Sequence, residues 1–502
     1  MKNKTLGLAF VAAALISLAT GCNDTLRQFI NPIPGPAGNP GSLAHAIVLS
    51  TNPGNGQPGL LPAQGCNVAG TGSNLHIDVS GDSVVGVVST GPNPQFLGKG
   101  GNRAFVLNCD NTISSYIALL PLAGSPQVVT QPPGPSGAIS GGTSSVGNFY
   151  VTNSGSNSVS MISSAFSSIT DVFPVGGEPV AVAGNVSNTK IYIVNRAGNS
   201  VTSVSTTDNT IIRNIPVGTS PIWAVMSADG AHVFVVNQGS NNISVIDTQL
   251  DQLQGQNPVI ATISVGASPN YAVYESTLKR LYVNNTGSNS ISVIDASRID
   301  LASVPQLLPT KIADVAVSGT PVSLAALSDG TKAYAALGNC ADAATNQTNL
   351  VTGPTPHLPN CTGNLVSVID VLALRERKTL QVGAGVVSID AAPNGSKVFV
   401  VSAQDTTTIR DNVHKPNCTV EPCLPGPVLP DQTFVTPSVS VIRTSDDSVL
   451  RTPVDASIVS LLPTFHTPQQ STSCVPAIDP NFNKTVPLPC PGQIPFLVRT
   501  FP

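Results

Sequence analysis

The sequence predicts an all-β protein, a β-propeller of four-stranded antiparallel blades, on three observations. Similar apolar segments end at asparagines 153, 195, 237 and 285, which are 42, 42 and 48 residues apart. Each unit contains four short strand signals separated by turn residues. Gly and Pro number 44 and 43 in 502 residues, whereas 10% of residues are charged and 4% are aromatic. A period near 42 with four strands per period, in a chain rich in turn residues, is typical of propeller blades.

The unit that contains Asn237 illustrates the four strands. Gly218 to Pro221 leads into an inner strand at 222–227, and Asp229-Gly230 can reverse the chain because both residues adopt positive φ readily. The second, third and fourth strands are expected at 232–236, 242–247 and 259–265. Apolar side chains on both faces of these strands predict that each blade packs between two others. The asparagines that recur at turns are interpreted as caps of backbone groups, not as ligands.

The repeat resembles that of the bacterial YVTN family of β-propeller proteins. That family's unit reads Gly-x-x-Pro, an apolar strand, Asp-Gly, Tyr-Val-Thr-Asn, a short Gly/Asn turn and Ser-Val-Ile-Asp. Tyr150 to Asn153 reproduces the tetrapeptide, and the surrounding frame recurs along most of the chain. The resemblance implies the fold, and it permits an enzyme of the lactonase or quinoprotein type, but propellers carry many unrelated activities.

Seven complete repeats lie between about residues 91 and 454, and a partial one precedes them. Segments 44–50, 73–79 and 83–88 resemble its second, third and fourth strands, so it lacks an inner strand. The apolar segment 456–462 is predicted to supply that strand, because a ring closed by both termini leaves no open sheet edge. Eight blades, one of them split between the termini, are therefore favoured over seven.

The amino terminus resembles a bacterial lipoprotein signal. Lys2 and Lys4 precede an apolar run from Leu6 to Ala19, and Gly21-Cys22 follows. Cleavage before Cys22 would leave a thiol for lipidation, with the lipid as membrane anchor. An Asp directly after the lipidated cysteine resembles an inner-membrane retention signal. This chain has Asn23 at that position, and this difference favours the outer membrane or cell surface. The predicted organisation is a signal peptide at 1–21, a Pro/Gly-rich tether at 22–43, a propeller at 44–466 and a disulfide-stapled extension at 467–502.

Eight cysteines remain after Cys22, and none shows paired Cys-x-x-Cys spacing. An even number in an exported chain predicts four disulfides. Connectivity does not follow from sequence, and pairing between neighbours is the working hypothesis: Cys66 with Cys109, Cys340 with Cys361, Cys418 with Cys423, and Cys474 with Cys490.

Charge and motifs narrow the function classes. A net charge of −4, with charged residues spread along the chain, argues against nucleic acid as a partner. Nucleophile-elbow and zinc-protease motifs are absent from the sequence, and no catalytic residue, metal or cofactor is predicted. Trp223 is expected on an inner strand near the channel, where core packing is favoured over ligand stacking. His232 is expected to be a packed core residue, whereas His357 and His414 lie in long connections and are the histidines considered for binding.

The connection between the second and third strands is enlarged in three repeats, at 51–72, 338–364 and 403–437. Because all blades have the same orientation, these connections are expected on one face of the ring, on consecutive blades. Long connections in a compact domain are often functional. The favoured function is a lipid-anchored binding or scaffold module for a protein or glycan. The alternatives are a channel enzyme and a structural surface-layer component.

Overall fold

The computed structural model describes most of the chain between residues 44 and 501. The described residues are 44–51, 72–79, 83–118 without 93, 101–102 and 109, 127–130, 138–143, 148–163, 168–184, 189–339 without 254 and 304, 362–403, 406–409, 432–435, 438–450, 477–479, 484–486 and 494–501.

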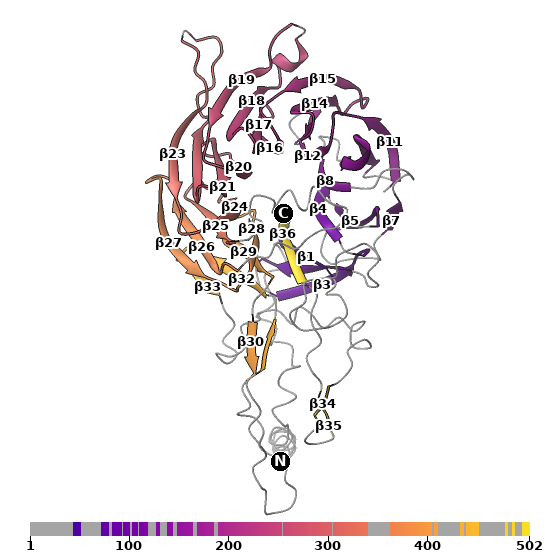
Figure 1. The fold of residues 1–502 in the computed structure, drawn as a ribbon, viewed down its shortest axis with the longest axis vertical. Coiled ribbons are helices and arrows are strands. Elements are labelled where there is room, and N and C mark those ends of the chain that lie inside the picture. The colour runs from indigo at the N-terminus through magenta and orange to yellow at the C-terminus, as the bar shows by residue number, and fades with distance from the viewer. Residues whose placement is uncertain are drawn as a thin grey trace, which may run out of the picture.

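Eight four-stranded antiparallel sheets form a ring, which confirms the predicted eight-bladed propeller (Figure 1). Blades are numbered here in chain order, with strands given from the centre outward. Blade 1 consists of β36 (Ile494–Phe501), β1 (His45–Thr51), β2 (Ser73–Asp78) and β3 (Ser83–Ser89), and blade 2 of β4 (Pro94–Gly100), β5 (Arg103–Asn108), β6 (Thr112–Ile117) and β7 (Gln127–Thr130). Blade 3 consists of β8 (Ala138–Thr143), β9 (Phe149–Asn153), β10 (Ser158–Ser163) and β11 (Ser168–Pro174), and blade 4 of β12 (Pro179–Ala183), β13 (Lys190–Asn195), β14 (Ser200–Ser205) and β15 (Ile211–Pro216).

Blades 5 to 8 complete the ring, and blade 8 carries an additional hairpin, β30 (Thr406–Ile409) and β31 (Gln432–Val435), between its second and third strands. Blade 5 consists of β16 (Pro221–Met226), β17 (His232–Asn237), β18 (Asn242–Asp247) and β19 (Val259–Ser264), and blade 6 of β20 (Pro269–Glu275), β21 (Arg280–Asn285), β22 (Ser290–Asp295) and β23 (Thr310–Ala316). Blade 7 consists of β24 (Pro321–Ala326), β25 (Lys332–Leu337), β26 (Leu365–Asp370) and β27 (Arg375–Gln381), and blade 8 of β28 (Val386–Ala391), β29 (Lys397–Ser402), β32 (Ser438–Arg443) and β33 (Ser448–Leu450).

Blade 1 is split between the two ends of the chain, but its inner strand is β36, not the predicted segment 456–462. Figure 1 shows β36 beside β1 at the centre of the ring. The position is therefore filled, and segment 456–462 lies outside the described residues. Gly492-Gln-Ile-Pro495 has the same Gly-x-x-Pro form that precedes the other inner strands, and the same bulge follows Pro495. The ring thus extends past the predicted boundary at 466, into the segment that was expected to be an extension.

The core lies between blades, as the apolar pattern predicted. The second strands place one large side chain at the same position of successive blades, and each is 0% exposed: Phe105, Tyr150, Tyr192, Phe234, Tyr282, Tyr334 and Phe399. Full burial of such a side chain contributes about 1.5–3 kcal/mol. This burial recurs in seven of the eight blades, so the apolar stabilisation is distributed around the ring.

The asparagines that end the second strands bond to side chains, which corrects their interpretation as backbone caps. Asn237 Nδ2 donates to Ser244 Oγ at 2.9 Å, and Asn285 Nδ2 donates to Ser292 Oγ at 2.9 Å. A Cβ on Gly218 would lie 2.7 Å from the Asn237 side chain. The repeated glycine and asparagine are therefore two parts of one close contact.

The asparagines in the following turns do cap the backbone, and they do so across blades. Asn241 Oδ1 accepts from the Ser268 amide at 2.8 Å, and Asn199 Oδ1 accepts from the Ser220 amide at 2.8 Å. Both asparagines have positive φ, which Asn tolerates better than most residues. The repeated turn therefore ties each blade to the next on one face of the ring.

A basic residue at the start of several second strands forms a second contact between blades. Lys332 Nζ donates to the Thr444 carbonyl at 2.7 Å, and Lys397 Nζ donates to the Val79 carbonyl at 2.7 Å. Lys190 reaches the Thr248 carbonyl in the same manner. The Lys397 contact joins blade 8 to blade 1 and so spans the closure of the ring.

Candidate functional site

The three enlarged connections leave one face of the ring from consecutive blades, as predicted. They join β25 to β26 in blade 7, β29 to β32 in blade 8 and β1 to β2 in blade 1. The equivalent turn of blade 5 has only residues 238–241. We call this side of the ring the loop face, and the side with the turns between first and second strands the hairpin face.

Hydrogen bonds fix the bases of these connections. Gly363 N donates to Gly338 O at 2.6 Å and closes the base in blade 7, while Val386 N donates to Gly363 O at 3.0 Å and ties that base to blade 8. In blade 1, Gly72 N donates to Gly91 O at 3.0 Å. The connections therefore start from positions held by the ring.

The blade 8 connection contains regular structure. Residues 406–409 and 432–435 pair antiparallel, from Thr406 opposite Val435 to Ile409 opposite Gln432. In Figure 1 this hairpin projects from the rim of the ring below blades 8 and 1. Sequence analysis identified the long connection but did not identify its strands.

The direction of β1 places the described start of the chain on the opposite face. His45 pairs with Phe501 at the hairpin-face end of blade 1, whereas Thr51 pairs with Ile494 at the loop-face end. Residue 44 therefore meets the ring on the hairpin face, and the enlarged connections leave from the loop face.

Most of the predicted site residues lie outside the described residues. These are Cys22, His357, His414 and the eight cysteines Cys66, Cys109, Cys340, Cys361, Cys418, Cys423, Cys474 and Cys490. The predicted lipidation and disulfide pairing thus remain predictions. In the described part of the chain, we find no helix with the length and apolar character needed to cross a membrane.

Trp223 lies on the inner strand β16, as predicted, and it is half-buried. Its indole Nε1 donates to the Ala272 carbonyl of the next inner strand at 3.1 Å, and its ring centroid is 4.9 Å from that of Tyr271. Trp223 therefore packs blade 5 against blade 6, the role that core packing implied.

Two charged side chains occupy an inner-strand position that is small or aliphatic in the other blades. The residue paired with the large second-strand side chain is Asp390 in blade 8 and Arg499 in blade 1. The equivalent residues of the other blades are Gly98, Gly142, Ala183, Val225, Val273 and Ala325. The channel thus carries an acid and a base on neighbouring inner strands.

Asp390 is already well bonded. Its Oδ2 accepts from the Thr500 amide at 2.8 Å, and its Oδ1 accepts from the Ala391 amide at 3.0 Å. Burial raises the pKa of Asp390, and the Arg499 guanidinium opposes that shift. The carboxyl therefore helps to join blade 8 to β36 across the ring closure.

Arg499 has more donors than the described structure uses. Its Nη1 donates to the Val498 carbonyl at 3.2 Å, and among the described residues it forms no ion pair within 4 Å. Burial raises the pKa of the Tyr271 hydroxyl, and the Arg499 guanidinium opposes that shift. Sequence analysis missed Arg499 because β36 had not been recognised; the Gly-x-x-Pro at 492–495 was the available signal.

Two histidines that had no common spacing in the sequence meet between blades 1 and 2. The rings of His45 and His76 stack with centroids 5.1 Å apart, and both residues are 0% exposed. His76 Nε2 lies 2.9 Å from the Tyr116 hydroxyl. Burial, with a smaller contribution from His45, lowers the pKa of His76 to about 3. In the described ranges, no three His, Cys, Asp or Glu side chains form a group that could hold a metal ion.

His232 was expected to be a packed core residue, but it is half-buried and lines a small pocket between blades 5 and 6 with Asp229, Phe234, Tyr274 and Lys279. Its Nε2 lies 3.8 Å from Asp247 Oδ2. The pocket measures about 90 Å³, the volume of roughly three waters. Asp229 Oδ1 already bonds to Ser227 Oγ at 2.6 Å. We assign no ligand to this pocket.

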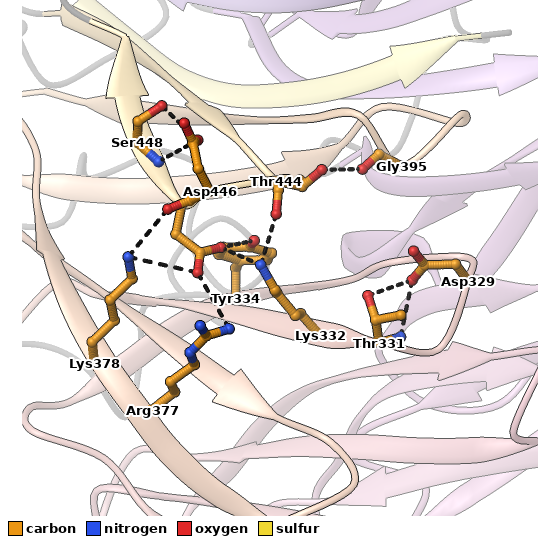
Figure 2. A network of polar contacts seen from close by, with 11 residues as sticks. Asp329, Thr331, Lys332, Tyr334, Arg377, Lys378, Gly395, Thr444, Asp446 and Ser448 are labelled. Carbon is orange, nitrogen blue, oxygen red and sulfur yellow. Dashed lines mark hydrogen bonds and ion pairs between the residues drawn. The ribbon is translucent and has the colours of Figure 1, made fainter.

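A larger polar network joins blades 7 and 8 (Figure 2). Asp447, in the turn after β32, accepts from Lys332 Nζ at 2.7 Å and from the Tyr334 hydroxyl at 2.7 Å. Arg377 Nη1 and Lys378 Nζ lie 3.8 and 3.6 Å from its other oxygen. The Asp447 side chain is only 1% exposed, so this network is a structural junction between blades.

Comparison with known proteins supports the fold. No protein-family model and no curated protein matches the sequence. Dihydro-heme d1 dehydrogenase NirN, solved in complex with DHE, is 11% identical, with a TM-score of 0.54 over 82% of this chain and 72% of that one. Streptogramin B lyase is 13% identical (TM-score 0.42; 61% of this chain, 90% of that one), and the Myceliophteria thermophila Cps50 (Swd1) β-propeller domain is 10% identical (TM-score 0.43; 61% and 92%). The similarity to NirN supports the β-propeller fold, and at this identity it concerns the fold alone.

Proposed function

We propose that the protein is a binding or scaffold module of the YVTN type, exported and held at a bacterial envelope by a lipid on Cys22, and that it binds its partner through the loop face. The observation that supports this proposal best is the polarity of blade 1. Residue 44 meets the ring on the hairpin face, and the enlarged connections of blades 7, 8 and 1 leave from the loop face. An anchor that precedes residue 44 therefore leaves the loop face free.

The ring suits this role because its junctions are rigid and repeated. Apolar burial, turn asparagines and basic side chains connect successive blades, so long connections can vary without loss of the core. The partner is a protein or glycan, since three long connections on neighbouring blades of one ring can contribute to a single binding surface. The disulfides of the neighbour pairing would restrict these loops through unfolded-state entropy, by about 3 kcal/mol each for loops of some twenty residues.

The test shortens the connections and leaves the ring unchanged. Residues 340–361 and 405–435 are each replaced by the turn of blade 5, residues 238–241. The β-sheet circular dichroism and melting temperature are expected to stay nearly unchanged, while capture of envelope proteins and binding to a glycan array are lost. The control shortens residues 301–306 on the hairpin face, between β22 and β23 and inside the bridge of Asp300 with Leu307, which should leave binding intact. Binding that survives both loop deletions would contradict the proposal.

The proposed anchor has its own test. Substitution Cys22→Ser should abolish labelling by a fatty-acid analogue and release the protein from the membrane fraction. Unchanged labelling would exclude lipidation at Cys22 and leave the loop-face assay as an independent question.

A further inference from the structure

The junction between blades 6 and 7 collects buried polar atoms that have no hydrogen-bond partner. Fourteen such side-chain atoms occur among the described residues, and five of them belong to Asn270, Asn284 and Ser367. These three residues are at most 1% exposed. Burial of a polar group without a partner is costly, and nearly all such groups bond to protein or to ordered water. We propose that this junction is a hydration site, in which ordered water bonds to Asn270 and Asn284.

Strand register brings the two asparagines together. Tyr271 pairs with Asn284, and a bulge leaves Asn270 as the extra residue before it. At a bulge two residues of one strand oppose one residue of its partner, so Asn270 and Tyr271 both lie opposite Asn284. The equivalent pairs of three other blades each belong to one apolar cluster: Val180 with Val194, Ile222 with Val236, and Val322 with Ala336. Asn270 and Asn284 therefore lie side by side on one face of blade 6.

That face packs against blade 7, which offers the amides no side-chain partner. Tyr271 belongs to the same apolar cluster as Leu324 and Ala335 of blade 7. Ala335 is smaller than the buried residue at the same position of every other blade, which is Val48, Val106, Val151, Ile193, Val235, Val283 or Val400. The proposed water takes the volume of the two or three carbons that Ala335 lacks, since one water needs about 30 Å³.

The amide pair is a local feature of blade 6 and not part of the repeat. The residues equivalent to Asn270 are Gln95, Ile139, Val180, Ile222, Val322, Val387 and Phe496, and those equivalent to Asn284 are Leu49, Leu107, Thr152, Val194, Val236, Ala336 and Val401. Only in blade 6 are both positions polar. The partner of the two amides must therefore also be specific to this junction.

The chemistry of the two amides selects water as that partner. Both Nδ2, a donor, and Oδ1, an acceptor, are unmet in Asn270 and in Asn284. By contrast, Asn237 at the end of its strand lacks a partner only at Oδ1. A metal cation would serve the Oδ1 atoms alone, and an anion would serve the Nδ2 atoms alone. Water both donates and accepts, and a buried water makes about three hydrogen bonds.

A high-resolution crystal structure of the full chain tests the site directly. We expect an ordered water within hydrogen-bond distance of both Asn270 and Asn284. Crystals soaked in rubidium chloride or sodium bromide report a bound cation or anion by anomalous scattering, and no such peak should lie at the amides. Two amides bonded to each other with no water beside them, or a rubidium or bromide peak at this position, would overturn the proposal.

Variants test the site in solution by urea unfolding. The double variant Asn270→Ile/Asn284→Val gives blade 6 the residues of blade 5 and removes the groups that hold the water. Ala335→Val gives blade 7 the valine of blade 5 and fills the proposed volume. Ala335→Val should lower the urea midpoint in the wild-type chain, where it displaces bonded water, and should leave the midpoint unchanged or raise it in the double variant.

The matched control is Ala325→Val, which enlarges an alanine of the same blade on the side that packs against blade 8. Blades 5 and 6 have Val225 and Val273 at this position. The control should shift the urea midpoint equally in the wild-type chain and in the double variant. A fall of the midpoint for Ala335→Val that is equal in both backgrounds would show overpacking alone and would overturn the proposal.

Discussion

The junction between blades 4 and 5 and the junction between blades 7 and 8 meet the same requirement in different ways. Each has a Lys-x-Tyr sequence on a second strand, Lys190 with Tyr192 and Lys332 with Tyr334. Asp251 of the next blade accepts from the Tyr192 hydroxyl and lies close to the Lys190 ammonium, and Asp447 accepts from both Tyr334 and Lys332. Asp447 lies in the short turn after the third strand, whereas Asp251 lies in a 3-10 helix, η4 (Leu250–Gln252), inserted in the equivalent connection.

Both aspartates are buried, but the cations around them differ in their exposure to solvent. At the first junction, Lys190 and Asp251 are 3% and 0% exposed, with Nζ 3.5 Å from Oδ2. At the second, Lys332 is 15% exposed, and two further cations, Arg377 and Lys378, approach Asp447 from the surface at 56% and 39% exposure. Both junctions therefore have an aspartate beside the Lys and Tyr side chains, but the aspartate comes from a different position of the repeat in each.

The largest effect is expected for Asp251→Ala. The substitution leaves Lys190 buried without its carboxylate and removes acceptors from Tyr192 and Ser203. Loss of one partner of a buried pair costs about 3–5 kcal/mol. Urea unfolding measures the change, with Asp208→Ala on an exposed turn as control. A loss below about 1 kcal/mol would show that the buried pair is not needed.

Asp447→Ala should destabilise somewhat less, by about 2–3 kcal/mol, because Arg377 and Lys378 remain hydrated after the acid is removed. The adjacent Asp446→Ala is the matched control. Asp446 accepts from the amide and hydroxyl of Ser448 and lies 3.7 Å from Arg443 Nη1, all at the exposed surface, so its loss should cost less than about 1 kcal/mol. Equal losses for the two variants would contradict the assignment of Asp447 as the junction residue.

The junction between blades 1 and 2 has a neutral polar contact and should respond to acid. Because the pKa of His76 is lowered to about 3 in the folded protein, the unfolded chain takes up a proton first as pH falls below the ordinary value near 6.5. The stabilisation is therefore full above pH 6.5 and is lost as pH falls toward 3, by on the order of 3 kcal/mol at pH 4. Urea midpoints between pH 7 and 4 should fall less in His76→Gln than in wild type. Parallel curves would contradict this prediction.

The smallest effect concerns salt. One molar NaCl should screen the exposed Arg377 and Lys378 contacts with Asp447 and cost less than about 1 kcal/mol, whereas the enclosed Lys190 pair should be insensitive. The double variant Arg377→Gln/Lys378→Gln should abolish this salt response in urea unfolding. A response that persists in the double variant would place its origin elsewhere.

The repeat predicted much of the fold because local requirements recur in each blade. Tyr150, Tyr192 and Tyr282 identified the buried second strands, and Asp229-Gly230 identified a hairpin. Segment 456–462 was predicted as the inner strand of blade 1 from its apolar character. The Gly-x-x-Pro at residues 492–495 was the sequence signal that marks the actual inner strand, β36.

The candidate channel site was less accessible to sequence reasoning. Trp223 could be placed on an inner strand, but Asp390 and Arg499 are 109 residues apart in sequence and adjoin only after β36 pairs with β1. Asp251 and Asp447 show a related difficulty, since one lies in an insertion and the other in a standard turn. Contacts made across blades depend on register, which periodicity alone does not provide.

The closure of blade 1 by β36 has a consequence for biosynthesis. The strands β1 to β3 are made first, yet their central partner begins at residue 494, more than 400 residues after β1 ends at residue 51. At typical translation speeds of about 5–20 residues per second, the blade waits some 20 to 90 seconds for its inner strand. During that interval β1 presents an unpaired edge, the kind of surface that holdase chaperones protect. The first strands made are therefore among the last to gain their full set of partners, and a chain that ended before residue 494 would leave the edge of β1 unpaired.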